Sequence, residues 1–370
     1  YPVVRVLATN TPVKLIAQRG SWFQITLPTG GYGWVAASLV SIGGPAVSTP
    51  SATRSVVGYY TVNFSGDRSS YDVLKAQTGA LTAIAPFSYS VSRTGKVAGN
   101  HFSDAMKLVR DNGLKSLALV HNISGSNFNK SEVSALLNSA PARAAAVKNI
   151  TKILTDRGYD GVNIDFENVP PGDRAVLTKF MKELAAALKP KGLLVTMSVP
   201  AKHTDSSKSA WVGAFDYRAL GEICDQVMLM TYDEHTSGTG AGPVASAPWV
   251  EKVIKYAVSQ IPRHKVLMGI AAYGYDWNTQ TNKARAVSYS QAMNTASKNG
   301  VRVGWDDRAQ VPSYSYKSGG VTRRVYFESA DSLKIKLKLV ERYDIGGIAI
   351  WRLGQEDDAS WRVIKASLMN

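Results

Sequence analysis

Short apolar segments recur along the chain from residue 55 onward, and longer stretches with helical periodicity separate them. A strand that is buried on both faces is a short continuous apolar run, so this alternation predicts parallel strands joined by helices. Eight such runs are present, and eight strands is the number that closes a (β/α)8 TIM barrel. We therefore predict an α/β fold of this type. The predicted strands are 56–62, 81–91, 116–120, 161–167, 193–199, 227–232, 266–273 and 347–351.

The stretches between these runs carry helix signals. Apolar residues recur every fourth position from 176 to 188, where a Lys-Pro-Lys-Gly segment ends the pattern, and residues 357–368 supply the last helix. Residues 333–339 alternate with period two, as a strand would, but their place between the seventh and eighth strands favours a helix. The gap between those two strands is too long for one helix. We therefore predict a small α+β insertion at about 278–327, at the C-terminal face of the barrel.

Residues 1–41 show a different pattern, in which short apolar strands are separated by turn residues. This pattern predicts a small all-β barrel module. Segments 20–25 and 31–35 resemble those of bacterial Src-homology-3-like domains, which are usually longer, so we expect the first strand to precede the first residue. Residues 42–54 are rich in Pro, Ser and Thr, as linkers are, which assigns residues 55–370 to the barrel domain.

The charge balance narrows the class of partner. The chain carries 43 Lys and Arg against 28 Asp and Glu, a net charge of +15, which favours nucleic acid, an anionic membrane surface or an anionic cell-wall polymer. The basic residues are dispersed without a nucleic-acid motif, so we expect no nucleic-acid partner. No apolar run approaches the roughly 20 residues of a membrane helix, and we expect no membrane span. The one cysteine, Cys224, excludes an internal disulfide and is predicted to be a buried structural thiol.

Acidic side chains occupy one face of the fourth predicted strand. Side chains alternate along a strand, so Asn163, Asp165 and Glu167 share a face, with the two carboxylates roughly 7 Å apart along it. A barrel interior is normally filled by apolar layers, which makes this pair a candidate for acid–base catalysis. One ionised carboxylate would raise the proton affinity of the other. The alternative is a buried ion-pair cluster or a cation site. Asp160 has the opposite parity, and we expect it to hold the strand or the turn.

Segment 160–167, DGVNIDFE, resembles the D-x-x-D-x-D-x-E strand of glycoside hydrolase family 18, with Asn163 where the motif has Asp. Within that family the chain is most similar to the spore-cortex and cell-wall N-acetylglucosaminidases of endospore-forming bacteria. The resemblance covers residues 55–370. It continues through segments 168–174, 192–196, 230–235, 269–277 and 346–351.

The resemblance implies substrate-assisted hydrolysis with retention of configuration. Glu167 would protonate the leaving oxygen, the substrate's own 2-acetamido oxygen would attack the anomeric carbon, and Asp165 would stabilise the oxazolinium ion. Tyr232 would orient the acetamido group, and Glu167 would then act as base toward water. Trp351 would form the sugar-stacking floor. The implied substrate-binding residues are Asn163, Met230, Asp233, Trp351, Tyr59, Phe87 and Tyr89.

Other chemistries find no support in the sequence. The five histidines are isolated, without zinc-binding spacing, and no G-x-S-x-G elbow of a serine hydrolase is present. No metal or organic cofactor is implied.

We predict a secreted hydrolase of the cell wall or spore that cleaves β-1,4 bonds after N-acetylglucosamine in peptidoglycan. Anionic cell-wall polymers would be its partners, and the N-terminal module would help to retain it on the wall. Two alternatives stay open: a chitinase with the same chemistry on chitin-type polysaccharide, and a carbohydrate-binding lectin on an inactive barrel. Glu167 argues against the lectin, since such lectins typically lose the acid.

Overall fold

The structure, a computed structural model, describes residues 6–7, 11, 13, 15–27, 31–40 and 54–369, and it divides the chain into two compact units, Tyr1–Ala52 and Thr53–Asn370. The described part of the first unit is an antiparallel sheet in the order β1-β2-β3, which confirms an all-β module. The predicted linker lies outside the described residues except at Arg54. The elements of this unit are β1 (Leu15–Arg19), β2 (Trp22–Thr26), β3 (Tyr32–Ala36) and the 3-10 helix η1 (Ala37–Leu39).

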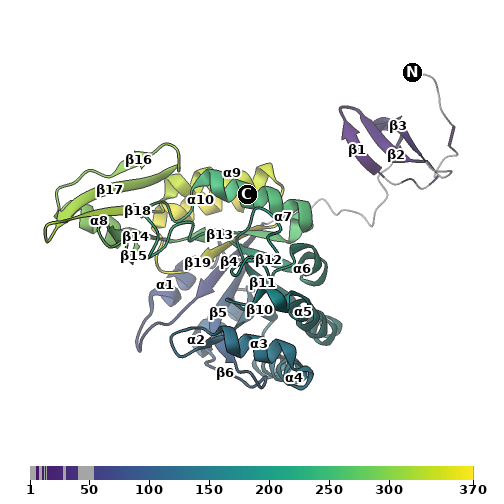
Figure 1. Cartoon of the computed structure of the whole chain (residues 1–370), viewed down its shortest axis with the longest axis horizontal. Coiled ribbons are helices and arrows are strands. Elements are labelled where there is room, and N and C mark those ends of the chain that lie inside the picture. Colours follow the sequence, from purple (N-terminus) through teal and green to yellow (C-terminus); the bar gives the residue numbers. More distant parts are fainter. Residues whose placement is uncertain are drawn as a thin grey trace. The chain divides into compact units, whose positions relative to one another are not determined.

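The second unit contains a closed barrel of eight parallel strands, as predicted (Figure 1). The strands follow one another around the barrel in chain order, and the pairing of β4 with β5 closes it. The short strand β6 (Val97–Gly99) pairs with the end of β5. The barrel strands are β4 (Ser55–Tyr60), β5 (Ala83–Val91), β7 (Lys115–His121), β10 (Gly161–Asp165), β11 (Leu194–Pro200), β12 (Gln226–Met230), β13 (Val266–Ala271) and β19 (Gly347–Trp351).

Helices cover the outside of the barrel. Because side chains alternate along the strands, the barrel has two separate apolar layers, one between the strands and the helices and one in its interior. Side chains that point outward from the strands pack against the helices, as where the Phe166 ring stacks on Phe180 with centroids 5.5 Å apart. Alternate side chains fill the interior, among them Tyr59, Leu119 and Met228. The helices are α1 (Ser69–Ala76), α2 (Ser103–Asp111), α3 (Lys130–Asn138), α4 (Ala140–Arg157), α5 (Arg174–Leu188), α6 (Tyr217–Ile223), α7 (Ala247–Gln260), α9 (Ala330–Arg342) and α10 (Asp358–Leu368).

Helix α9 confirms the helix predicted at 333–339 and explains why its sequence alternates like a strand. Ser329 caps its first turn in a capping box. Leu333, Lys336, Leu337 and Val340 then form a buried stripe at helical spacing. Lys336 belongs to this buried stripe because its ammonium group pairs with the buried carboxylate of Glu328 at 2.5 Å.

The segment between β13 and β19 holds the predicted α+β insertion (green, Figure 1). Its five-stranded antiparallel sheet has the order β15-β14-β18-β17-β16 and carries helix α8 on one face. The sheet begins at Tyr273, earlier than the predicted residue 278, because β14 follows β13 after one residue and the two read as a single apolar run. The elements are β14 (Tyr273–Asn278), β15 (Ala284–Ser288), α8 (Tyr289–Lys298), β16 (Gly304–Asp306), β17 (Val311–Ser318) and β18 (Val321–Phe327).

Within the described ranges, no helix has the length and apolar character needed to cross a membrane. Cys224, before β12, is fully buried, which agrees with a structural thiol. Burial raises the pKa of this thiol to about 12, so it stays protonated and unreactive at neutral pH.

Candidate active site

Strand β10 directs its side chains as the alternation predicts. Val162, Ile164 and Phe166 join the layer beneath the helices, and Asn163 and Asp165 occupy the inward positions between them. Asp165 is the last residue of the strand and is only 5% exposed. The inward carboxylate therefore lies at the C-terminal end of the barrel, where the active sites of this fold are found.

Glu167 lies two residues beyond the end of β10 and is held by a side chain that the sequence analysis missed. Asn122, directly after β7, is 1% exposed. Its Oδ1 accepts from the backbone N–H of Glu167 at 2.9 Å, and its Nδ2 donates to the backbone carbonyl of Glu167, also at 2.9 Å. This pair of bonds fixes the backbone of Glu167 against the neighbouring strand. Its position in the sequence could have indicated this role, since Asn122 is a polar residue at the C-terminal end of a strand that adjoins β10.

The electrostatic environment favours a protonated Glu167. Burial raises the pKa of the Glu167 carboxyl, and the negative charges of Asp165 and Asp233 raise it further. Burial also raises the pKa of Asp165. Among the residues that the structure describes, no basic group contributes to the raised pKa of either carboxyl, which argues against the ion-pair alternative. A carboxyl group that holds its proton near neutral pH, beside a second carboxyl group, is suited to general acid catalysis.

Tyr232 follows β12 and lies among the acidic groups. Burial raises the pKa of its hydroxyl well above the usual value, and the nearby Tyr59, Asp165 and Glu167 add to the shift, so the hydroxyl remains a hydrogen-bond donor. Gly269 on β13 makes room for the ring, because a Cβ at that position would lie 2.9 Å from Cε1 of Tyr232. The local sequence thus positions a phenol beside the two carboxylates.

Asp233 adopts a left-handed backbone conformation with φ of 60°. Its carboxylate accepts from the hydroxyl of Tyr273 at 2.5 Å and from that of Tyr275 at 3.0 Å. Both tyrosines belong to β14, so the insertion holds this carboxylate in place. Asp233 acts on Glu167 through its charge, an effect that the sequence analysis did not anticipate.

Aromatic side chains form the floor of the site. Trp351, at the end of β19, is partly exposed and lies edge-on to Tyr59 and Phe87, with centroid distances of 5.4 Å and 5.7 Å. The Tyr59 hydroxyl lies 2.7 Å from Oγ of Ser198, deep in the barrel. Trp351 also packs in one cluster with Tyr232. The structure therefore brings together Trp351, Tyr59 and Phe87; Trp351 and Phe87 are partly exposed, and Tyr59 is buried.

Two of the predicted substrate-binding residues lie elsewhere. Asn163 is fully buried, its Nδ2 donates to Oγ1 of Thr196 at 3.0 Å, and its Oδ1 accepts from Oγ of Ser198 at 2.9 Å. These bonds satisfy the polar atoms of the Asn163 side chain inside the barrel, so Asn163 lies beneath Asp165 and supports the site. A bulge between Phe87 and Tyr89 shifts the alternation of β5. Tyr89 consequently packs beneath the helices against Tyr159, which removes it from the substrate-binding set.

Met230 and Asp160, the remaining predicted residues, lie at opposite ends of their strands. Met230 is the last residue of β12 and is partly exposed beside Tyr232. Asp160 accepts from the backbone N–H of Ser116 at 2.8 Å and from its hydroxyl at 3.0 Å, which ties the starts of β10 and β7 together. Among the residues that the structure describes, no three His, Cys, Asp or Glu side chains gather as a metal site requires.

Comparison with known proteins agrees with this geometry. Residues 55–356 match the sequence profile of "Glycosyl hydrolases family 18", and residues 1–41 match "Bacterial SH3 domain". The cortical fragment-lytic enzyme of Bacillus subtilis (strain 168) is 29% identical over 289 residues, covering 77% of this chain and 67% of that protein.

Two solved structures are similar to the chain. The crystal structure of chitinase from Chromobacterium violaceum ATCC 12472 has a TM-score of 0.80 and 31% identity, covering 86% of this chain and 99% of the other. The spore cortex-lytic enzyme SleL of Bacillus cereus has a TM-score of 0.79 and 28% identity, covering 84% and 73%. Both resemblances seen in the sequence are confirmed.

Proposed function

The chain belongs to glycosyl hydrolase family 18, and we propose that it cleaves β-1,4 bonds after N-acetylglucosamine in peptidoglycan with retention of configuration. The observation that carries this proposal is the pair of carboxyl groups formed by the buried Asp165 and the partly buried Glu167, which have no basic partner among the residues that the structure describes. Burial and neighbouring negative charge keep the proton on Glu167, which is the state that a general acid needs.

In the first step, Glu167 donates its proton to the glycosidic oxygen as the bond to the anomeric carbon breaks. The oxygen of the substrate's 2-acetamido group attacks that carbon and forms an oxazolinium ion. Asp165 stabilises the N–H side of this ion, and the Tyr232 hydroxyl donates to the acetamido oxygen before attack. Tyr232 suits this role because its raised pKa keeps it protonated.

In the second step, Glu167, now ionised, removes a proton from water, which attacks the anomeric carbon from the face that the leaving group occupied. This returns the proton to Glu167 and gives a product with the original configuration. Asn163 in place of a third acid leaves one charge fewer beneath Asp165, which favours ionised Asp165 when the cation forms. Trp351 stacks against the sugar ring bound next to the cleaved bond.

The choice of peptidoglycan is supported by the relatives and by charge. The cortical fragment-lytic enzyme and the spore cortex-lytic enzyme are named for the spore cortex. A net charge of +15 suits an anionic wall polymer better than uncharged chitin. We extend the proposal to a secreted protein of the cell wall or spore, in which the SH3 module adds affinity for the wall.

Chitin hydrolysis is the second candidate, favoured by the similarity to the Chromobacterium violaceum chitinase at 31% identity. The two functions are separated by incubating the enzyme with purified peptidoglycan and with chitin and identifying the products by mass spectrometry. Muropeptides that end in N-acetylglucosamine support the proposal. Chitin oligomers without muropeptide release would assign the chitinase function instead, and binding without any product would assign a lectin.

A further inference from the structure

One face of the insertion sheet continues outward from the active site. The hydroxyl of Tyr275 binds Asp233 at 3.0 Å, and Tyr275 lies opposite Tyr326 in the antiparallel pair of β14 and β18. Opposed residues of such a pair share a face, and so do residues two apart along a strand. Arg324, two residues before Tyr326 and opposite Trp277, therefore lies on this same face. It is about 7 Å along the strand from the pair that reaches Asp233.

The side chain of Arg324 folds back along β18 toward the barrel. Its guanidinium carbon lies 5.1 Å from the centre of the Tyr326 ring, and its Nη2 donates to the Tyr326 hydroxyl at 3.0 Å. An aromatic ring that stacks on a guanidinium holds its plane and leaves the N–H groups at its edge free to donate. Arg324 is thus held in place, and its head group points to the side where Tyr275 meets Asp233.

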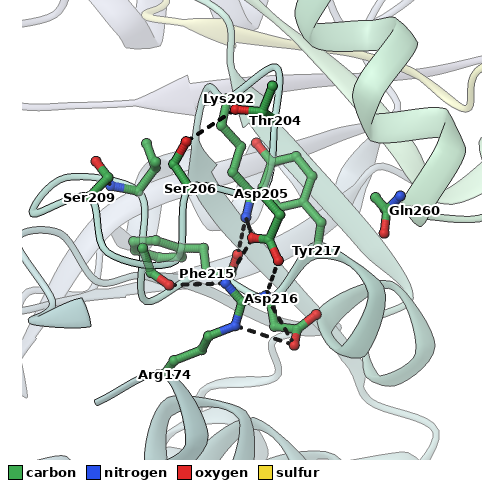
Figure 2. A network of polar contacts seen from close by, with 12 residues as sticks. Arg174, Lys202, Thr204, Asp205, Ser206, Ser209, Phe215, Asp216, Tyr217 and Gln260 are labelled. Atoms are coloured by element: carbon green, nitrogen blue, oxygen red, sulfur yellow. Dashed lines mark hydrogen bonds and ion pairs between the residues drawn. The ribbon is translucent and has the colours of Figure 1, made fainter. Parts of the chain in front are cut away.

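Two groups of partly buried cations show how this protein neutralises such charges elsewhere. In Figure 2 the Asp205 carboxylate lies between Nζ of Lys202 at 3.0 Å and the Arg174 guanidinium at 2.9 Å. In the insertion, Arg323 pairs with the buried Asp276 at 2.8 Å, on the sheet face that carries α8. Both arrangements avoid the free-energy cost of a buried charge without a partner.

Arg324 differs, because no carboxylate of the residues that the structure describes pairs with it. Besides the tyrosine hydroxyl, its Nη1 lies 3.5 Å from Oγ of Ser315, and its Nε is buried without a hydrogen-bond partner. Lys317, two residues beyond Ser315 on β17, adds an exposed cation to the same face. Asp306, at the edge of this face, already accepts from two backbone N–H groups of the turn that follows it. An unpaired guanidinium beside an active site indicates a place for a negative group of the substrate.

Peptidoglycan supplies such a group and chitin does not. Its N-acetylglucosamine units alternate with N-acetylmuramic acid, whose lactyl ether ends in a carboxyl group that carries a short peptide. Each N-acetylglucosamine in a strand therefore has a neighbour with a carboxylate, either on the lactyl group or on its peptide. Two extended peptide residues span about 7 Å, which matches the distance along the strand to Arg324. An arginine binds a carboxylate through two parallel N–H groups, so the chemistry of the two partners is complementary.

We propose that Arg324 binds a carboxylate of the lactyl–peptide group on a muramic acid next to the cleaved bond, and that it thereby favours peptidoglycan over uncharged glycans. This inference rests on the proposed function and names the substrate group that distinguishes it from chitin. The carboxylate is remote from the reacting atoms and meets Arg324 equally in the bound substrate and in the transition state. Its contribution therefore appears in KM and leaves kcat nearly unchanged.

The test measures kcat and KM for wild type, Arg324→Gln and Arg324→Lys on soluble strands released from peptidoglycan. Three forms of the strands are compared: native strands, strands whose peptides have been removed, and native strands whose carboxyl groups have been converted to amides. We expect KM of Arg324→Gln on native strands to rise about tenfold, the equivalent of about 1.4 kcal/mol. Arg324→Lys, which keeps the charge but not the two-nitrogen fork, should lie between Arg324→Gln and wild type.

The modified strands identify the group that Arg324 binds. On amidated strands, KM of the wild type should rise by the same factor of about ten, and Arg324→Gln should add little to it. If the difference between wild type and Arg324→Gln persists on strands without peptides, the lactyl carboxylate is the ligand. If that difference requires the peptide, a peptide carboxylate is the ligand. Either result supports the inference.

Arg285→Gln is the matched control. Arg285 carries the same charge on the same sheet, but its side chain is 68% exposed and lies opposite Asp276, on the face that carries α8. The control should leave KM unchanged on all three substrates. The inference is overturned if Arg324→Gln keeps the wild-type KM on native strands, if it loses as much on amidated strands, or if Arg285→Gln loses as much. A wild-type enzyme that releases nothing from any of these strands would instead refute the proposed function, and the inference with it.

Discussion

Replacement of Asn122 by Ala tests whether the backbone of the catalytic acid must be held in place. The change removes the two 2.9 Å hydrogen bonds between the Asn122 amide and the backbone of Glu167, together with a 3.3 Å bond to the carbonyl of Asn129. Each good bond contributes about 1 kcal/mol, and a buried group left unpaired costs about 1–3 kcal/mol. We expect the free energy of unfolding to fall by about 2–4 kcal/mol.

The effect on catalysis should exceed the effect on binding. With its backbone released, the Glu167 carboxyl no longer lies at a fixed position relative to the glycosidic oxygen, and a misplacement of about 1 Å lowers the rate about 100-fold. We therefore expect kcat of Asn122→Ala to fall by about that factor, with a change in KM of less than about threefold. Steady-state kinetics on soluble oligosaccharides and urea unfolding measure the two effects.

Thr82→Ala is the matched control. The Thr82 hydroxyl accepts from the backbone N–H of Val56 at 2.9 Å and donates to its carbonyl at 3.2 Å. As with Asn122 and Glu167, one side chain binds both backbone groups of one residue, but here at the N-terminal end of the barrel. It should lower stability and leave kcat unchanged. If Asn122→Ala destabilises the fold as Thr82→Ala does but keeps the wild-type kcat, the positioning role assigned to Asn122 is wrong.

Three further predictions concern the acid, its electrostatics and the N-terminal module. Glu167→Gln should abolish turnover while oligosaccharide binding persists in calorimetry, and an unchanged rate would remove Glu167 from its role. Asp233→Asn removes a negative charge that raises the pKa of Glu167. Since the rate falls when Glu167 loses its proton, the alkaline limb of the pH–rate profile should shift to lower pH by about one unit. A limb that stays in place or shifts to higher pH would contradict this. Deletion of residues 1–54 should weaken co-sedimentation with purified peptidoglycan more than it slows hydrolysis of soluble fragments. Salt should weaken co-sedimentation of the full chain, since 1 M salt screens charges beyond about 3 Å. Equal sedimentation with and without the N-terminal module would show that the module does not retain the enzyme on the wall.

The sequence predicted the barrel because its strands are short apolar runs that alternate with helical stretches, and it predicted the carboxylate face because strand alternation has a fixed period of two. The prediction for Tyr89 failed because a bulge, which no residue pattern in β5 announces, reverses that alternation after Phe87. Asn163 followed the alternation correctly, but its depth in the barrel depends on partners on β11, which alternation does not specify.

Long-range contacts account for the features that the sequence did not reveal. Asn122 lies 45 residues from Glu167 along the chain, and only the adjacency of β7 and β10 brings them together. Asp233 was predicted as a substrate contact, yet its effect on the pKa of Glu167 depends on how Tyr273 and Tyr275 orient it from the insertion. Such effects require the three-dimensional arrangement of several elements at once.

The most direct test of the central claim identifies the bond that is cut and the anomeric form of the product. Purified peptidoglycan is digested briefly, the fragments are reduced and analysed by mass spectrometry, and a soluble substrate is followed by nuclear magnetic resonance during turnover. The account predicts new reducing ends that are N-acetylglucosamine and a first-formed product in the β configuration. Reducing ends that are N-acetylmuramic acid, or a first-formed α product, would contradict it.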